Sequence, residues 1–405
     1  MLQKNFNPVL RFMVVSDIHY QNTQGREQER MKRALKLARK ISESHETYKK
    51  LDAVYVVGDF ATSGSREQML DFKDTLDKGL KPETQRTLMM ASHEFHGENG
   101  EEGALERFAE IYNVPVDNHK VINGFHFISI TTTHGCDFDE KKVAFAAEEL
   151  KKARKADPKK PIFFFQHPHI SGTVSGSINW GEDALYSTLM NYPQVIDFSG
   201  HSHAPVNDPR SIHQKHFTSL GTGSISYTEL DEFDKVYGTL PPNKENFAQF
   251  LLVEANEKGD VRVYPIDVIT ENFFPLVWEI DEPWNPDKFK YTDERYKNAA
   301  VPVFPEGFKV DFSEVTEDGF TVTFPQAQIS EYYVNDYIIK VYEKETGLIV
   351  KQIAIWSEYY FYNMPEVLTQ VIDGLEKSTE YKVTITAGSF FNTKTVSGEF
   401  FIKTK

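Results

Sequence analysis

The sequence contains very little cysteine. Among its 405 residues there is one, Cys136, so the chain cannot form an internal disulfide and packing must stabilise its fold. A lone cysteine is more often a small buried apolar residue than a catalytic thiol, and we expect Cys136 to be buried. The redox compartment stays open on this evidence.

The sequence also lacks long apolar runs. No stretch approaches the roughly 18 consecutive apolar residues that a membrane-spanning helix needs, so we expect no membrane span. The apolar segment from Val9 to Val15 is too short for a signal peptide and has no small-residue cleavage site after it. As given, the chain is expected to be soluble and cytoplasmic, or exported if a signal peptide has been removed.

Basic residues are fewer than acidic ones, 45 against 60, which gives a formal net charge of -15. Binding to nucleic acid or to an anionic membrane generally requires clustered lysine and arginine, so we expect no nucleic-acid polymer as a partner. A small anionic substrate is compatible with this charge if a bound metal ion supplies local positive charge.

From Arg11 to about Asp267, short runs of β-branched and aromatic residues alternate with amphipathic segments. This alternation predicts a layered α/β domain. The predicted strands are 12–16, 53–58, 87–91, 125–131, 161–166, 195–199, 250–254 and 261–266. The predicted helices are 31–41, 67–76, 105–112, 143–156 and 183–191.

The composition and periodicity of the sequence change after this region. Four prolines among polar residues predict a linker at 282–305. Beyond it, helical periodicity is replaced by short strands, predicted at 308–312, 320–324, 337–342, 348–355, 381–386 and 399–403. We therefore expect an α/β domain at 1–281, a linker at 282–305 and an all-β sandwich at 306–405.

Five polar clusters follow predicted strands. Because ligands bind beyond the carboxyl ends of strands in open α/β sheets, the clusters are expected to meet there. Carboxylates and imidazoles without thiolates suit a hard or borderline divalent ion and exclude zinc-finger chemistry. Each cluster alone is weak evidence, but their ordered recurrence after strands favours a metal site. The clusters are Asp17-Ile18-His19, Gly58-Asp59, Ser92-His93-Glu94, His167 and Gly200-His201-Ser202-His203.

With these motifs, the region from Arg11 to Asp267 resembles the calcineurin-like metallophosphoesterase family, whose pattern is Asp-x-His, Gly-Asp, Gly-Asn-His-Asp/Glu, His and Gly-His-x-His. The resemblance implies a four-layered α/β sandwich. It also implies two divalent metal ions, as Mn2+, Fe2+/Fe3+ or Zn2+. The implied ligands are Asp17, His19 and His203 for the first ion, Asp59 as the bridge, and His167 and His201 for the second ion.

The third motif carries the remaining implied roles. His93 matches the family's catalytic histidine, and Glu94 is its carboxylate neighbour, expected to orient or electrostatically support the imidazole. Ser92 stands where the family has an asparagine that ligates the second metal. Because the serine side chain is shorter, its hydroxyl is expected to reach that ion through a water.

The C-terminal region resembles a fibronectin type III module. The resemblance rests on Gly319-Phe320-Thr321-Val322-Thr323-Phe324, on Leu375 six residues before Tyr381, and on Ala387-Gly388-Ser389 before a polar turn and the last strand. Phe324 replaces the usual core tryptophan.

The expected activity is hydrolysis of a small phosphate ester, preferably a phosphodiester, by a hydroxide that bridges two ions. A carboxylate has two oxygens, so Asp59 can contact both ions, and the ions also draw charge from the phosphoryl oxygens. The oligomeric state stays open. Residues beside the clusters that could contact substrate are Tyr20, Phe60, Phe95, His96, His169, Asn179 and Trp180, and the glycine-containing loop after His167 is the candidate specificity loop.

Two other interpretations remain. In one, Ser92 has emptied the second site, and the domain is a non-catalytic module that binds a metal or ligand. In the other, the C-terminal sandwich carries the main function, in adhesion to carbohydrate or protein through aromatic residues such as those at 359–362.

Overall fold

The computed structural model describes residues 1–21, 25–97 and 99–405. The chain divides into two compact units: unit 1 contains residues 1–231 and 243–292, and unit 2 contains 232–242 and 293–405. The sequence did not indicate that 232–242 leaves the first unit and packs with the second. No helix in the described ranges is long and apolar enough to cross a bilayer.

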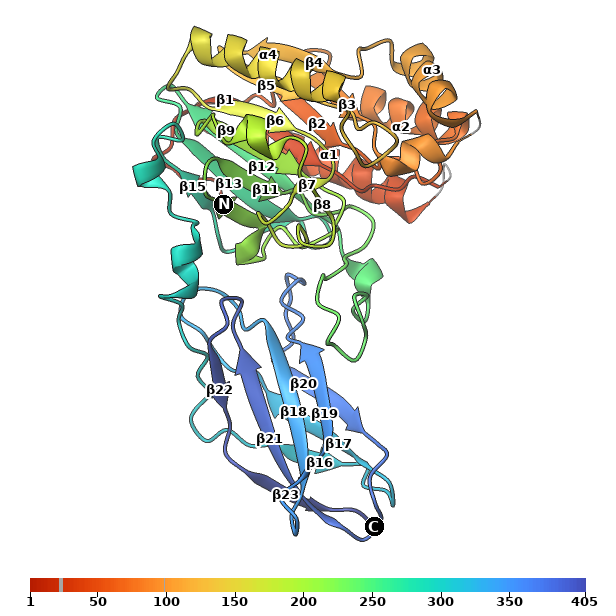
Figure 1. Cartoon of the computed structure of the whole chain (residues 1–405), viewed down its shortest axis with the longest axis vertical. Coiled ribbons are helices and arrows are strands. Elements are labelled where there is room, and N and C mark those ends of the chain that lie inside the picture. The colour runs from red at the N-terminus through yellow and green to blue at the C-terminus, as the bar shows by residue number, and fades with distance from the viewer. Residues whose placement is uncertain (22–24, 98) are drawn as a thin grey trace. The chain divides into compact units, whose positions relative to one another are not determined.

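Unit 1 is a mixed α/β fold, as predicted, with two sheets facing each other between layers of helices (Figure 1). The first sheet has the strand order β14-β13-β12-β1-β2-β3, with β15 paired to β13. The second sheet has the order β10-β11-β9-β6-β5-β4, and β7 pairs with β8 separately.

The predicted strands of unit 1 are present with somewhat different ends, whereas β4, β7, β8, β10, β11, β14 and β15 were not predicted. The first sheet contains β1 (Pro8–Val15), β2 (Ala53–Val57), β3 (Gln85–Met89), β12 (Gln249–Asn256), β13 (Val261–Asp267), β14 (Asn272–Phe273) and β15 (Trp278–Ile280). The second contains β4 (Asn118–Ile122), β5 (Phe125–Ser129), β6 (Ile162–Phe165), β9 (Val195–Ser199), β10 (Ile212–Gln214) and β11 (Thr218–Gly221). The separate pair is β7 (His169–Ile170) and β8 (Gly181–Glu182).

The helices of unit 1 form its two outer layers. They are α1 (Arg26–Ser44), α2 (Arg66–Gly79), α3 (Gly100–Tyr112), α4 (Glu140–Ala156) and α5 (Tyr186–Leu189), with 3-10 turns η1 (Ser92–His96), η2 (Pro209–Ser211), η3 (Lys244–Asn246) and η4 (Pro286–Lys288). The predicted helix at 183–191 is reduced to the four residues of α5.

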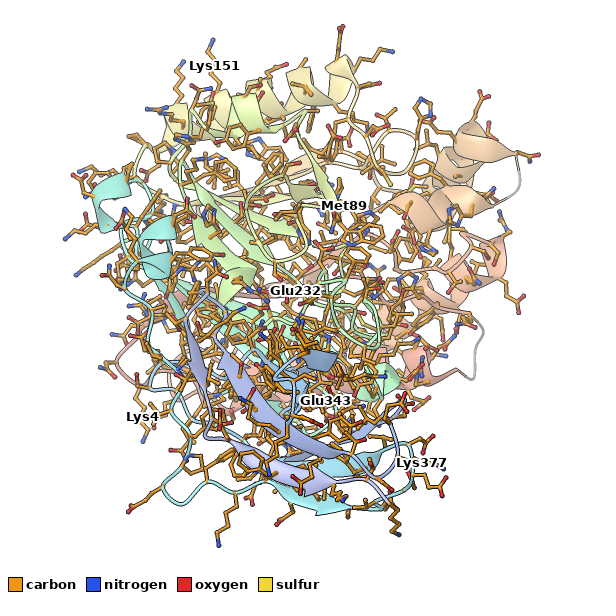
Figure 2. All side chains as sticks on the ribbon, turned by 60° about the horizontal axis from the view of Figure 1, so that its bottom comes forward. Lys4, Met89, Lys151, Glu232, Glu343 and Lys377 are labelled. Carbon is orange, nitrogen blue, oxygen red and sulfur yellow. The ribbon has the colours of Figure 1, made fainter. Side chains whose placement is uncertain are left out.

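Each helix layer buries one apolar stripe against a sheet. Helices α1, α2 and α3 share a core with the first sheet, and α4 and α5 share another with the second. The opposite face of α4 is solvated, as Lys151 shows in Figure 2, whereas Met89 of β3 is buried. This division between apolar and charged faces follows from the helical period of the sequence.

Aromatic rings fill the space between the two sheets. Phe12 of β1 makes edge contacts with Phe127, Phe163 and Phe198 of the second sheet at centroid distances of 5.1, 4.8 and 6.0 Å. Because side chains alternate along a strand, Met13 and Val15 point to the opposite face, toward α1 and α2. The core therefore fixes β1 on both faces, and with it the loop that follows.

Unit 2 consists mainly of β-strands, as predicted. Its smaller sheet has the order β16-β17-β20, and its larger sheet β19-β18-β21-β22, with β23 also paired to β21. The elements are η5 (Asp293–Tyr296), β16 (Asp311–Ser313), β17 (Phe320–Pro325), β18 (Asp336–Glu343), β19 (Ile349–Trp356), β20 (Val367–Ile372), β21 (Glu380–Gly388), β22 (Lys394–Val396) and β23 (Phe400–Lys403). Strands β20 and β22 were not predicted.

Segment 232–242 is anchored in unit 2 by a buried lysine. The side chain of Lys235 is 0% exposed, and its ammonium lies 2.9 Å from a carboxylate oxygen of Asp336 and 4.3 Å from the ring centroid of Trp356. The N–H of Val236 donates to the carbonyl of Ala354 at 3.0 Å. A buried ammonium requires such partners, so this contact specifies where the segment packs.

Candidate metal centre

The predicted clusters meet at one edge of the two facing sheets in unit 1. Strands β1, β2 and β3 are parallel to one another, as are β5, β6 and β9, so in each set the carboxyl ends lie at a common edge. The loops after β1, β2, β3, β6 and β9 carry the five motifs.

The backbone at these strand ends has an unusual conformation. Asp17, Asp59, His201 and His203 have φ values of 52°, 48°, 70° and 55°, in the left-handed region that non-glycine residues rarely adopt. At Gly58, which has φ 79°, a Cβ atom would lie 2.6 Å from Nδ1 of His167. Strained backbone conformations of this kind concentrate at functional sites. Here they turn each loop sharply after its strand, so that the polar atoms of the loops converge.

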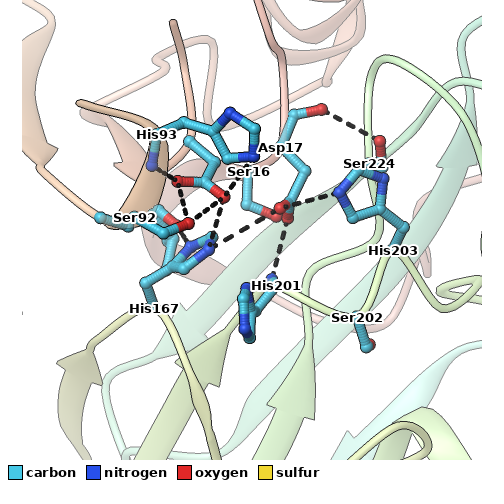
Figure 3. A network of polar contacts seen from close by, with 12 residues as sticks. Ser16, Asp17, Ser92, His93, His167, His201, Ser202, His203 and Ser224 are labelled. Carbon is cyan, nitrogen blue, oxygen red and sulfur yellow. Dashed lines mark hydrogen bonds and ion pairs between the residues drawn. The ribbon is translucent and has the colours of Figure 1, made fainter. Parts of the chain in front are cut away.

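The first group of converging atoms comes from Asp17, His19 and His203, whose candidate ligand atoms all lie within 4.8 Å of one another. Nε2 of His203 is 3.3 Å from Oδ1 of Asp17 (Figure 3). The same nitrogen is 3.2 Å from Nε2 of His19. Nδ1–H of His203 donates to the carbonyl of Tyr227 at 3.1 Å. This bond directs Nε2 of His203 toward the carboxylate.

The second group comes from Asp59, His167 and His201. Nε2 of His167 is 3.1 Å from Oδ2 of Asp59, and its Nδ1–H donates to the carbonyl of Val57 at 2.6 Å. Asp59 also belongs to a third group with His19 and His93. Its carboxylate thus lies between the histidines of the two sides.

Two buried polar atoms in this region make no hydrogen bond to the described residues, although each lies at ion-pair distance from a neighbouring side chain. They are Oδ1 of Asp17 and Nε2 of His167, which are 3.8 Å apart. Buried polar atoms in native proteins are almost always satisfied by protein, water or an ion. Carboxylate oxygen beside imidazole nitrogen is the donor set that a divalent cation accepts, so the residues fit the implied metal ions.

The electrostatics of the metal-free centre separate the histidines into two kinds. Burial would lower the pKa of His167, but Asp59 and Asp17 raise it to about 10, and Asp17 likewise outweighs burial and raises the pKa of His203. Burial lowers the pKa of His19 to about 3 and that of His201 to about 4. Protons on two histidines therefore offset part of the carboxylate charge.

The carboxylates respond in the opposite direction. Burial alone would raise the pKa of Asp17, but His203 and His167 hold it below its ordinary value. For Asp59, burial is outweighed by His167, which holds that pKa well below the ordinary value. Both carboxylates are therefore ionised and available as ligands near neutral pH.

The Ser92–His93–Glu94 motif forms the start of η1. The hydroxyl of Ser92 lies 3.1 Å from Oδ2 and 3.2 Å from Oδ1 of Asp59. Nε2 of His93 is 4.0 Å from Oδ2 of Asp59, and its Nδ1–H donates to the carbonyl of Thr62 at 2.7 Å. Both side chains therefore lie beside the shared carboxylate.

Glu94 makes backbone contacts that the sequence did not indicate. Its carboxylate is 0% exposed and accepts the backbone N–H groups of Asp59, Ala61 and Ala91 at 3.0, 2.8 and 2.9 Å. The bond that orients the imidazole of His93 comes from the carbonyl of Thr62 instead. Glu94 thus ties the loop after β2 to the loop after β3.

The structure separates the proposed substrate contacts into buried and accessible residues. Tyr20 and Phe60 are 0% exposed and belong to the core, so they are corrected to packing residues. Phe95 packs against the same core, whereas His96 is exposed, with its ring 4.9 Å from that of His93.

The other proposed contacts lie on the candidate specificity loop. His169 is 1% exposed and forms hydrogen bonds with the hydroxyls of Ser199 and Ser202 at 2.8 and 2.7 Å. It therefore fixes the Gly-His-Ser-His segment and is too buried to contact substrate. The ring of Trp180 lies 5.3 Å from that of His201, and Asn179 donates to Asp231.

The expectation that Cys136 is buried is wrong, because this residue is exposed. It lies in a tight hairpin in which Thr133 and Asp137 exchange backbone hydrogen bonds of 2.7 and 3.1 Å. The turn exposes its tip, so turn geometry decides the exposure rather than the apolar character of the thiol.

The loop after β11 is part of the centre and was missed from the sequence. The hydroxyl of Ser224 donates to the carbonyl of Asp17 at 3.0 Å, and the ring of Tyr227 lies 4.2 Å from that of His203. Its serine, glycine and tyrosine residues match no metal-ligand pattern, and only the parallel pairing of β11 with β9 brings them to this edge.

Comparisons with known proteins agree with this architecture. Residues 10–205 match the model of the calcineurin-like phosphoesterase family. No curated protein sequence matches the chain. The family match supports a metal-dependent phosphoesterase, which is a hydrolase, and implies divalent metal ions without specifying which.

Several solved structures are similar to parts of the chain. A purple acid phosphatase from yellow lupin seeds has a TM-score of 0.48 and 14% identity, and the match covers 65% of this chain and 52% of that one. The chain thus spans about half the length of the lupin protein. PhoD has a TM-score of 0.42 and 10% identity over 68% of this chain and 70% of its own. The FN5 domain of Drosophila Lar matches 26% of this chain over 94% of its own length, with a TM-score of 0.18 and 15% identity.

Proposed function

We propose that the chain hydrolyses phosphate esters, preferably diesters, at a centre that holds two divalent cations. The observation that supports this most is the shared position of Asp59, which belongs to one candidate ligand group with His19 and His93 and to another with His167 and His201. A carboxylate with an accessible oxygen on each side suits two neighbouring cations.

The proposed ligands follow the geometry of the groups. Asp17, His19 and His203 hold the first cation, and His167 and His201 hold the second, with Asp59 between them. When bound, the cations supply Lewis-acid charge at the phosphoryl group and lower the pKa of the attacking water. Ser92 donates its hydroxyl hydrogen to Asp59 and stabilises the ionised state of that carboxylate.

His93 is the proposed acid for the leaving group. Because its Nδ1–H is engaged by the carbonyl of Thr62, the second ring nitrogen is the one that faces Asp59 and the reacting phosphate. In the imidazolium state, Nε2–H can donate to the ester oxygen as the bond to phosphorus breaks. With 32% of its side chain exposed, His93 is also accessible to a substrate entering from solvent.

The preference for diesters rests on charge. A diester of phosphate carries one negative charge, whereas a monoester near neutral pH carries close to two. The chain has a formal net charge of -15, which opposes the approach of a dianion more strongly than that of a monoanion.

We also propose that unit 2 is a fibronectin type III module. No ligand of the metal centre is assigned to that unit.

Turnover measurements with and without metal test the proposal. Bis(p-nitrophenyl) phosphate and p-nitrophenyl phosphate are compared after chelation and again after addition of Mn2+, Fe2+ or Zn2+. We expect no turnover after chelation, recovery with at least one metal, and a higher kcat/KM for the diester. Absence of turnover under all metals, in folded protein that binds one cation instead of two, would support the non-catalytic alternative.

A further inference from the structure

The loop between β7 and β8 is fixed against the segment that carries His201 and His203. Nε2 of His169 bonds the hydroxyl of Ser202 at 2.7 Å. Gly176 has φ 86°, and a Cβ atom there would lie 2.3 Å from Cβ of Ser202. Only glycine permits this approach, so the loop is positioned directly relative to the candidate ligands.

The same loop is held internally at several points. The N–H of Trp180 donates to the carbonyl of Gly176 at 2.9 Å, and the N–H of Thr173 donates to the hydroxyl of Ser177 at 3.0 Å. Its ends pair as β7 and β8, and Asn179 donates to Asp231 on the neighbouring loop. A turn organised in this way loses little conformational entropy when a ligand binds.

This organised turn presents apolar surface beside the metal centre. The indole of Trp180 lies edge-on to the ring of His201, with an interplanar angle of 86°. Its Nε1 atom is buried, so the accessible part of the half-buried side chain is ring carbon. Ile178, two residues earlier, is 86% exposed, the highest value among the described large apolar residues.

We propose that the Ile178–Trp180 turn recognises the organic group of the phosphate ester and selects an aromatic or otherwise extended apolar group over a small or polyhydroxylated one. The inference rests on the proposed function, because the metal centre next to His201 places the phosphoryl group. An apolar group attached to that phosphate can contact carbon of Trp180 and cover Ile178, which removes apolar surface from water. A sugar or glycerol group carries less apolar surface and removes less of it from water in these contacts.

The selectivity of the holoenzyme between two aryl esters tests the inference. Phenyl phosphate and 2-naphthyl phosphate have leaving phenols of similar acidity, so a difference in kcat/KM reports contact with the second ring. We expect 2-naphthyl phosphate to be favoured by roughly tenfold. Ile178→Ser and Trp180→Ala should each reduce that ratio by roughly threefold or more. Val121→Ser, at an exposed apolar residue of β4, is the matched control and should leave the ratio unchanged.

A binding measurement separates this inference from the proposed function. The affinity of metal-loaded protein for 2-naphthyl phosphonate, which cannot be hydrolysed at oxygen, is measured by calorimetry beside phenyl phosphonate. Tighter binding of the naphthyl compound, weakened in Ile178→Ser, supports the recognition turn even if no ester is turned over. Turnover of both esters with equal kcat/KM, unchanged in Ile178→Ser, would overturn the inference and leave the proposed function standing. Absence of both binding and turnover with these compounds would overturn the inference, and turnover of bis(p-nitrophenyl) phosphate by the same preparation would show that the proposed function still stands.

Discussion

Loading the centre with divalent cations is expected to release protons from two histidines. In the metal-free chain, Asp59 and Asp17 raise the pKa of His167 to about 10, and Asp17 raises that of His203. A metal ligand must be a neutral imidazole, so each of these side chains has to lose a proton when a cation binds.

The number of released protons can be worked out for pH 7.5. His167, with a pKa of about 10, is protonated in nearly every metal-free molecule and releases about one proton. His203 contributes up to a second, whereas His19 and His201, with pKa values of about 3 and 4, contribute none. The total is between about one and two, compared with about 0.4 for four histidines of ordinary pKa.

The same values set the pH dependence of metal affinity. Deprotonating His167 at pH 7.5, with its pKa of about 10, costs roughly 3 kcal/mol. Raising the pH removes this cost, so the association constant increases by about tenfold per pH unit for each proton released. The increase continues until the pH passes the pKa of the metal-free histidine.

Calorimetric titration with Mn2+ in buffers of different ionisation enthalpy measures the released protons directly. His167→Asn should reduce the release by about one proton, whereas His216→Asn, which alters a histidine outside the three ligand groups, should not change it. A release below about half a proton at pH 7.5 would refute the assignment of the protonated histidines.

Three further predictions follow from individual contacts. Ser92→Asn should tighten binding of the second cation by roughly tenfold in metal titrations, because the amide oxygen extends one bond further than a hydroxyl that now lies 3.1 Å from Asp59. Glu94→Gln should lower the free energy of unfolding by about 2 kcal/mol in denaturant titrations. The carboxylate accepts three backbone hydrogen bonds, and the NH2 group of glutamine would face an N–H donor that it cannot accept from. Lys235→Met should cost about 3 kcal/mol in the same assay, since it leaves the buried charge of Asp336 without its ammonium partner.

The fold and the ligand groups of unit 1 could be predicted because both depend on local signals. Buried strands are short apolar runs, and each ligand motif follows such a run directly. Parallel pairing within each sheet and the packing of the two sheets then bring Asp17, Asp59 and His167 together. Strands such as β10 and β11 were missed because Ile212–Gln214 and Thr218–Gly221 contain too few apolar residues to produce a periodic pattern.

Features that depend on tertiary contacts could not be read from the sequence. Glu94 stands next to a predicted catalytic histidine, but backbone donors from another loop decide where its carboxylate points. The packing of 232–242 with unit 2 depends on Lys235 finding Asp336, about a hundred residues later in the chain. Tyr227 reaches His203 only through the order of strands in the second sheet.

The most direct test of the central claim compares the same substitution at two buried aspartates of unit 1. Asp59→Asn removes the carboxylate that the two cations are proposed to share. Asp197 is 0% exposed and burial raises its pKa to about 8, so it is mainly neutral at pH 7 and asparagine is a close substitute. In turnover of bis(p-nitrophenyl) phosphate at pH 7 with saturating Mn2+, we predict a loss of at least roughly a hundredfold for Asp59→Asn and a change within about threefold for Asp197→Asn. Near-normal turnover in a folded Asp59→Asn variant would contradict the two-cation centre.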